Sequence, residues 1–113
     1  MTDDILISTM NDIPGYRVTA VYGEVLGLTA RARNLFSNLG ASLRTVVGGE
    51  AGGYTKLLST SREQAVERLR QATRERGGNA VIAMRFDANE IGGMISEVVA
   101  YGTAVTIERV ASA

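Results

Sequence analysis

Apolar and polar side chains alternate in the first quarter of the chain, which is typical of β-strands. The alternation predicts a strand over residues 16–28, and residues 5–10, which are apolar on both faces, predict a shorter strand before it. Between them stand Pro14 and Gly15, a pair typical of tight turns because proline presets φ and glycine accepts a positive φ. The first quarter therefore predicts a hairpin of two antiparallel strands.

The apolar spacing then changes to three and four residues, which predicts two helices. The first helix begins at Thr29 as its N-cap and ends in the glycine-rich loop 48–53. The second helix covers residues 54–76, apolar on one side and charged on the other. Gly77 and Gly78 provide its C-terminal stop.

Two further strands are predicted at the end of the chain, over residues 79–87 and 94–110, with the connection 88–93 between them. A length of 113 residues and a mass of 12.0 kDa suit one domain covering residues 1–113. The predicted class is α+β: a two-layer α/β sandwich in which a mostly antiparallel sheet carries its helices on one face.

The last strand is apolar on both faces. Val99 and Tyr101 point to one side, and Val98 and Ala100 point to the other. A sheet face without helices normally carries polar side chains, so something else must cover this one. A loop of the same chain could cover this face, but a chain of this length has few residues to spare for such a loop. We therefore favour self-association.

Composition excludes several classes of function. Twelve basic and twelve acidic residues cancel, which argues against a nucleic-acid partner. The chain has neither Cys nor His, so thiolate and imidazole chemistry are excluded, and we expect no enzymatic activity. The N-terminus is acidic, and the longest uncharged apolar run has about half the roughly 20 residues of a membrane span. We expect a cytoplasmic protein without a membrane partner.

Several short segments together carry a family likeness. In chain order they are residues 13–16 (IPGY), 31–34 (RARN), 47–50 (VGGE), 53–58 (GYTKLL), 78–81 (GNAV), 85–87 (RFD) and 100–105 (AYGTAV). With them the chain resembles the YbjQ-like family of small bacterial proteins, which carries a heavy-metal-binding label. The resemblance covers about residues 5–107. It implies a dodecin-like, ring-forming subunit in a homopentamer, and it implies no settled function and no catalytic residue.

One candidate site would bind a small anion. Arg31, Arg33 and Asn34 stand at the predicted start of the first helix, where free amides and the helix dipole attract anions. Arg44 lies later on the same helix, and arginine binds carboxylate or phosphate bidentately. The alternative, which we favour, is that these arginines form ion pairs between subunits.

The loop 48–53 matches neither the phosphate-loop nor the dinucleotide-binding spacing, and a helix stop explains its glycines. Its charged residue, Glu50, remains a candidate, as does the neighbouring Tyr54. An alternative function is an enzyme whose active site is shared between subunits by Arg31, Arg33, Glu50 and Tyr54. Flavin storage would follow only from the dodecin analogy, and the absence of Trp counts against it.

Carboxylates supply the weak metal candidates, which are Glu50, Asp87, Glu90 and Glu97. They suit hard cations such as magnesium or calcium, and copies of Glu50 or Glu97 around a symmetry axis would form a carboxylate ring. The favoured alternative is an ordinary turn rim with Glu97 facing Arg85. No tight soft-metal site is expected, and no cofactor is indicated. The sequence thus predicts a non-enzymatic homo-oligomer that binds a small anion or ion or acts through its assembly.

Overall fold

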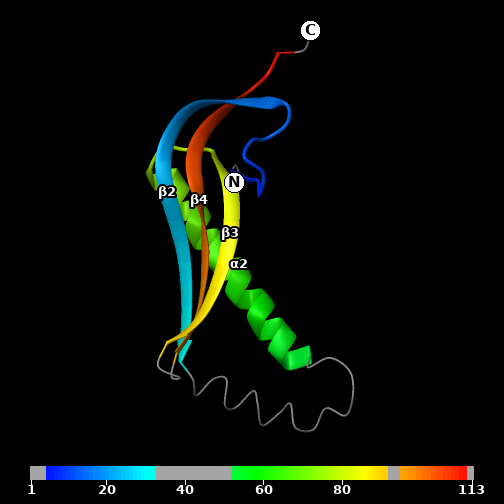
Figure 1. Ribbon diagram of the computed structural model, residues 1–113, viewed down its shortest axis with the longest axis vertical. Helices are drawn as coiled ribbons and strands as arrows, with labels where there is room; N and C mark the ends of the chain where they lie inside the picture. Colours follow the sequence, from blue (N-terminus) through cyan, green and yellow to red (C-terminus); the bar gives the residue numbers. More distant parts are fainter. Residues whose placement is uncertain (1–4, 33–51, 92–94, 112–113) are drawn as a thin grey trace.

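The computed structural model describes residues 5–32, 52–91 and 95–111. In these residues one helix packs against one sheet (Figure 1). The elements are β1 (Leu6–Ile7), β2 (Tyr16–Ala32), α2 (Gly52–Glu75), β3 (Ala80–Ile91) and β4 (Ile95–Arg109). β4 pairs antiparallel with both β2 and β3, and β1 pairs parallel with β3. The α+β class is confirmed. The part of the first predicted helix that follows residue 32 lies outside the described residues.

The turn at Pro14 and Gly15 is confirmed, but the predicted hairpin is wrong. The amide of Tyr16 donates to the carbonyl of Ile13 over 3.1 Å, and Gly15 has a φ of 86°. The strand order is β1-β3-β4-β2, so β1 and β2 lie at opposite edges of the sheet. The turn leads the chain across the end of the sheet, because the 17-residue β2 pairs with the 15-residue β4 and not with the two-residue β1.

β2 continues to Ala32, so the predicted helix start at Thr29 is wrong. The ladder with β4 extends until Ala32 lies opposite Ile95. Thr29 is 4% exposed and lies on the helix-facing side of β2 with Val25 and Gly27. Side chains continue to alternate between the two faces of the sheet through residues 29–32. Pairing with the long β4 keeps these residues in a strand although the helical spacing of apolar residues begins here.

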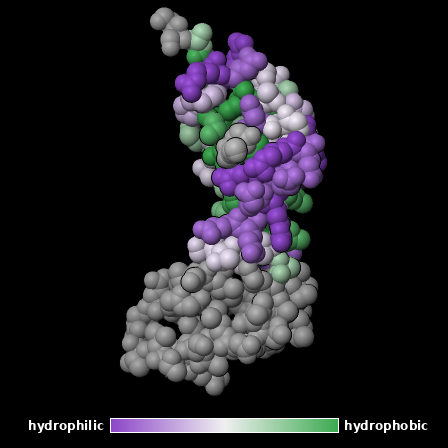
Figure 2. Space-filling model, turned by 180° about the vertical axis from the view of Figure 1, so that it is seen from behind, coloured by the Kyte–Doolittle hydropathy of each residue, from purple (hydrophilic) through white to green (hydrophobic). Residues whose placement is uncertain are grey.

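The predicted second helix is confirmed as α2, with boundaries shifted by one or two residues. Gly77 ends it with a φ of 89°. The amides of Gly77 and Gly78 donate to the carbonyls of Arg74 and Thr73, both over 3.0 Å, which is the Schellman arrangement. Seen from behind the view of Figure 1, hydrophilic residues gather across α2 (Figure 2). Among the described residues no helix is apolar enough over a sufficient length to cross a membrane.

Small residues let α2 approach the sheet closely. A methyl group added to Gly27 would overlap the carbonyl oxygen of Ala65 and lie 2.5 Å from the amide nitrogen of Leu69. The helix backbone therefore rests directly on the backbone of β2. Around this contact lies the main core cluster, whose buried members are Ile5, Val25, Ala65, Leu69, Val81, Met84, Ala100 and Ala104.

β3 and β4 are antiparallel neighbours, but the connection between them is shorter than predicted. Residues 88–91 belong to β3 and pair with β4, so the predicted connection 88–93 is wrong in its first part. The ladder shifts register at Ala83, which has a φ of 56°. Gly102 lies against this bulge, where a Cβ atom would come within 2.6 Å of Val81 Cγ1. The bulge thus requires glycine at that position of β4.

The sheet face away from α2 carries many apolar side chains, and the described residues cover only one end of it. There Ile13 and Tyr16 pack on the second core cluster, which includes Val105 and Ile107. Local wrapping therefore accounts for part of the predicted apolar face. It does not account for β2, which carries a row of exposed apolar side chains on this face. We call this the outer apolar row; it consists of Val18, Val21, Leu26 and Leu28, exposed by 40%, 65%, 55% and 45%.

Arg68 of α2 and Arg76, which directly follows the helix, bind carbonyl groups of the edge strand β2. Arg68 donates from Nη1 to the carbonyl of Leu28, and Arg76 donates from Nη1 to the carbonyl of Tyr22 over 2.9 Å. An unpaired sheet edge presents free carbonyls, and these contacts satisfy two of them. They also fasten the helix to the edge of the sheet.

Substitution of Gly27 by alanine should destabilise the protein severely. The added methyl group meets helix backbone, which cannot move aside as a flexible side chain can, so we expect a loss of about 3 kcal/mol or more of unfolding free energy. Gly15→Ala is the control, because its methyl group meets nothing within 4 Å. Only the positive φ is then penalised, by about 1–2 kcal/mol. Denaturant unfolding of both variants measures the difference, and equal losses would contradict the close packing.

Substitution of Thr29 by valine should stabilise the protein. Thr29 Oγ1 is buried and makes no hydrogen bond to any described residue. An unsatisfied buried hydroxyl costs about 1–3 kcal/mol, so its isosteric removal should raise the unfolding free energy by about 1 kcal/mol. Thr73→Val is the matched control, because the equally buried Thr73 hydroxyl donates to the Leu69 carbonyl over 2.9 Å. That variant should gain nothing, and a gain as large as that of Thr29→Val would contradict the explanation.

Candidate functional site

The residues predicted to bind an anion are only partly within the described residues. Arg31 lies in β2 opposite Ser96. The argument from a helix dipole therefore does not apply to Arg31, and this part of the prediction is wrong. Tyr54 lies in the first turn of α2. Outside the described residues lie Arg33, Asn34, Arg44 and Glu50. The anion site, and the enzyme site that shares residues with it, stay predictions.

The predicted cluster of Asp87, Glu90 and Glu97 is not assembled. Asp87 and Glu90 lie within β3 rather than in a turn. They are three residues apart, so they point to opposite faces of the sheet. Glu97 lies opposite Asn89 and accepts a hydrogen bond of 3.1 Å from its amide, so the predicted pairing of Glu97 with Arg85 is also wrong. Asp87 and Glu97 share the outer face, and Glu90 faces the helix side.

These donors do not suit a soft metal ion. In the described part of the chain no three acidic, His or Cys side chains come close enough to hold a metal. The whole sequence contains neither His nor Cys, which are the ligands that zinc, cadmium and copper(I) prefer. Asp87 and Glu97 on one face offer oxygen ligands, which favour a hydrated hard cation.

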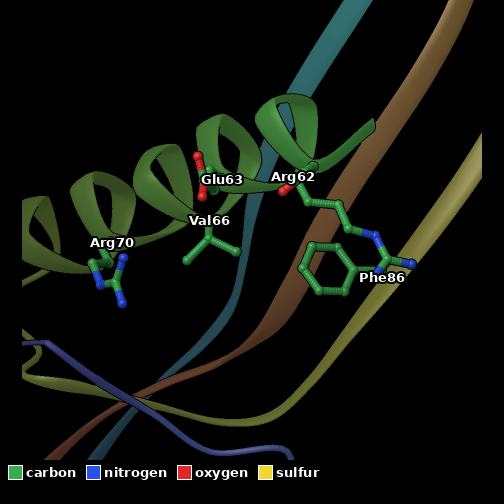
Figure 3. A pocket seen from close by; sticks show the side chains of 6 residues that line it. Arg62, Glu63, Val66, Arg70 and Phe86 are labelled. Atoms are coloured by element: carbon green, nitrogen blue, oxygen red, sulfur yellow. The ribbon is translucent and has the colours of Figure 1, made fainter. Parts of the chain in front are cut away.

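The structure forms a groove that the sequence did not indicate, between α2 and β3. It has a volume of about 340 Å³ and is lined by Ser59, Arg62, Glu63, Val66, Arg70 and Phe86. Arg62, Val66 and Arg70 are spaced by four residues, so they form one stripe along α2. Figure 3 shows Arg62 extended from the helix over the ring of Phe86, with Val66 on the same side and Glu63 turned away. The guanidinium carbon of Arg62 lies 4.7 Å from the centre of that ring.

A second hollow adjoins the groove at Phe86, which lines both. This hollow of about 430 Å³ is lined by Thr9, Met84, Arg85 and Phe86. The guanidinium of Arg85 is committed within it, because Nη1 donates to the carbonyls of Thr9 and Met84 over 2.8 and 2.9 Å. Arg85 thus fixes the segment after β1 against β3. The arginine of the neighbouring groove, Arg62, makes no such hydrogen bond to a described residue.

In the sequence the groove residues are an outer charged face. Arg62, Glu63 and Arg70 belong to the charged side of the second predicted helix, and charged residues opposite an apolar stripe normally face water. The signal that could have separated Arg62 and Arg70 is their spacing from Val66, an apolar residue among charged neighbours. Phe86 comes from a different element, and only the packing of α2 across the sheet brings it to this stripe.

Comparison with known proteins gives the family. The family model described as "Putative heavy-metal-binding" matches residues 5–108. The chain belongs to this YbjQ family. The UPF0145 protein YjfJ of Lactococcus lactis strain IL1403 is 53% identical over 108 residues, which cover 96% of this chain and 99% of that protein. A UPF0145 protein of Methanocella arvoryzae is 48% identical over 96% of this chain and 90% of its own length. The resemblance drawn from the sequence segments is confirmed.

A solved structure supports the fold of this YbjQ-family chain. It is a protein of unknown function from Pediococcus pentosaceus ATCC 25745 that belongs to the DUF74 family. It matches with a TM-score of 0.61 over 94% of this chain and 100% of that chain, at 15% sequence identity. At that identity the match shows the fold alone. The names of these relatives state no reaction.

Despite the family description, this chain should bind no soft metal tightly. Calorimetric titration of tag-free, chelator-treated protein with zinc and cadmium should show no site of micromolar affinity, because thiolate and imidazole ligands are missing. Magnesium or calcium should bind weakly at most, and Glu97→Gln should abolish such binding while Glu75→Gln on α2 leaves it unchanged. A stoichiometric zinc site of micromolar or better affinity would overturn this prediction.

Proposed function

We propose that this YbjQ-family protein is non-enzymatic and acts as a homo-oligomer, with the five-copy, dodecin-like ring that the family resemblance implies. The observation that carries the proposal is the outer apolar row. Its four side chains lie along β2, with Glu24 between Val21 and Leu26, on a face that the described residues cover only at one end. Exposed apolar surface of this kind marks an interaction site. We expect this assembly in the cytoplasm.

A second copy of the chain is the occupant that best suits this surface. β2 is an edge strand in the described sheet, so a neighbouring molecule can approach it without displacing another strand. Beside the row, Val99 and Tyr101 of β4 are half-buried and continue the apolar surface toward the centre of the sheet. Farther across, β3 contributes Arg85 and Asp87. The outer face is therefore mainly apolar toward β2, where Glu24 is the one charged side chain among the described residues, and charged toward β3.

This division favours a defined orientation of the partner. A contact between identical subunits that joins different surfaces generates a closed ring when its rotation closes, whereas a two-fold contact joins one surface to itself. The polar positions toward β3 would lie at the rim of an interface centred on the row, where charged groups tolerate exposure to water. The enzyme alternative with Arg31, Arg33, Glu50 and Tyr54 has no comparable support among the described contacts.

Substitution of Leu26 by glutamate should dissociate the assembly without unfolding the subunit. Leu26 is 55% exposed in the single chain, so a charge there is harmless to the subunit but is buried in the proposed interface. Light scattering should show a multiple of 12.0 kDa for the unmodified protein and a mass near 12.0 kDa for the variant. Val110→Glu is the matched control, since Val110 is 51% exposed and lies outside the row.

Ala100→Asp provides the opposite contrast. Ala100 is fully buried on the helix side of β4, so this charge should unfold the subunit itself, which circular dichroism would show. If the unmodified chain is a folded 12.0 kDa monomer at micromolar concentration, the proposal of a functional assembly is wrong. If the unmodified protein is instead a multiple of that mass, native mass spectrometry gives the number of copies.

A further inference from the structure

Arg62 is unusual among the arginines whose side chains the structure describes. The others each have a polar partner: Arg17 bonds Glu108, Arg70 and Arg74 lie near Glu67, and Arg109 bonds the Tyr16 hydroxyl. Arg68, Arg76 and Arg85 bond backbone carbonyls. Arg62 makes no hydrogen bond or ion pair to any described residue and instead lies over Phe86. Its donor edge is therefore available in a groove.

Contact with the ring prepares Arg62 for a ligand. A guanidinium over an aromatic ring is attracted to the ring face, which restricts an otherwise flexible side chain. The planar group keeps its N–H donors at its edge, in the fork that matches a carboxylate bidentately. Val66, one helical turn from Arg62, and the half-buried Phe86 supply apolar walls next to that fork. A volume of about 340 Å³ lies at the lower end of the range of small-molecule sites, roughly 300–1,000 Å³.

The charges around the groove favour a ligand with a single negative charge. Glu67 lies 3.8 Å from the Arg70 guanidinium and 3.5 Å from that of Arg74, so it partly neutralises the far end of the groove. Glu63 stands at the rim and repels additional negative charge. With Arg62, Arg70 and Arg74 set against Glu63 and Glu67, one positive charge is left over. This balance favours a monoanion over a phosphate dianion or a nucleotide.

We propose that the groove between α2 and β3 binds a small monocarboxylate with a flat apolar body. Its carboxylate accepts hydrogen bonds from the edge of Arg62, and its body packs on Val66 and beside Phe86. The Ser59 hydroxyl, which lines the same groove one turn before Arg62, offers a neutral donor to a ligand oxygen. The site lies on the helix side of the sheet, whereas the outer apolar row lies on the other face. Ligand binding therefore does not depend on the proposed assembly.

Benzoate is a suitable probe, because it combines one carboxylate with a flat ring. Titration of the isotope-labelled full chain with sodium benzoate at constant ionic strength should give saturable nuclear magnetic resonance shifts at Arg62, Val66 and Phe86. Benzamide, which has the same shape without charge, should bind at least tenfold more weakly. Arg62→Gln should weaken benzoate binding at least tenfold. Arg17→Gln removes the same charge from β2, far from the groove, and should leave the affinity within twofold.

Two further measurements make the outcome decisive. Inorganic phosphate should produce no saturable shift at Val66 or Phe86, and a response equal to that of benzoate would show a general anion effect and overturn the proposal. Equal benzoate affinity in Arg62→Gln and the unmodified chain would also overturn it. Light scattering of Arg62→Gln should give the mass of the unmodified protein. A changed mass would mean that Arg62 belongs to a subunit contact, and the groove would then not be a ligand site.

Discussion

The contact between the backbone of α2 and Gly27 is the constraint on which the rest of the structure depends. A helix normally packs on a sheet through intervening side chains, but here Gly27 lets the backbone of Ala65 and Leu69 rest on β2 itself. The buried alanines of β4, Ala100 and Ala104, keep the adjoining surface shallow. Because the helix lies so low, Arg68 and Arg76 reach the carbonyls of the edge strand. The same low crossing brings Arg62 and Val66 next to Phe86 and so creates the groove.

The two faces of the sheet differ in how their apolar side chains are covered. The face toward α2 buries its apolar residues within one chain, down to full burial of Leu69, Val81 and Ala100. Among the described residues, Ile13 and Tyr16 alone fold back over the outer face, at one end of it. The remaining apolar side chains on β2 are tolerated in a single chain but are better accommodated against a neighbour. The proposed assembly would therefore use the sheet face opposite to the one that stabilises the subunit.

Membership of the YbjQ family settles ancestry and fold for this protein, and its chemistry has to be derived from its own residues. The family description names heavy metals, yet this chain has neither thiolate nor imidazole ligands. Its described carboxylates are divided between the two faces of β3, which argues against a compact oxygen-ligand site as well. The groove with its stacked arginine is the better-formed recognition feature, since a cation, an apolar wall and an aromatic ring converge there.

Local pattern was sufficient wherever a structure depends on neighbours in sequence. Helical spacing and the glycine pair located α2 and its C-terminal stop, and proline followed by glycine located the turn before β2. Long-range pairing could not be predicted in the same way. Residues 29–32 carry both an alternating and a helical pattern, and only the ladder with β4 decides that they are strand. Asp87 and Glu90 are close in sequence, but their strand register separates them onto opposite faces. The sequence alone thus determined where α2 lies and how it ends, where the chain turns before β2, and which ligand chemistries are missing. Only the tertiary structure decided that β1 pairs with β3, that β2 becomes the edge strand, and that Arg62 meets Phe86, because each depends on contacts between residues far apart along the chain.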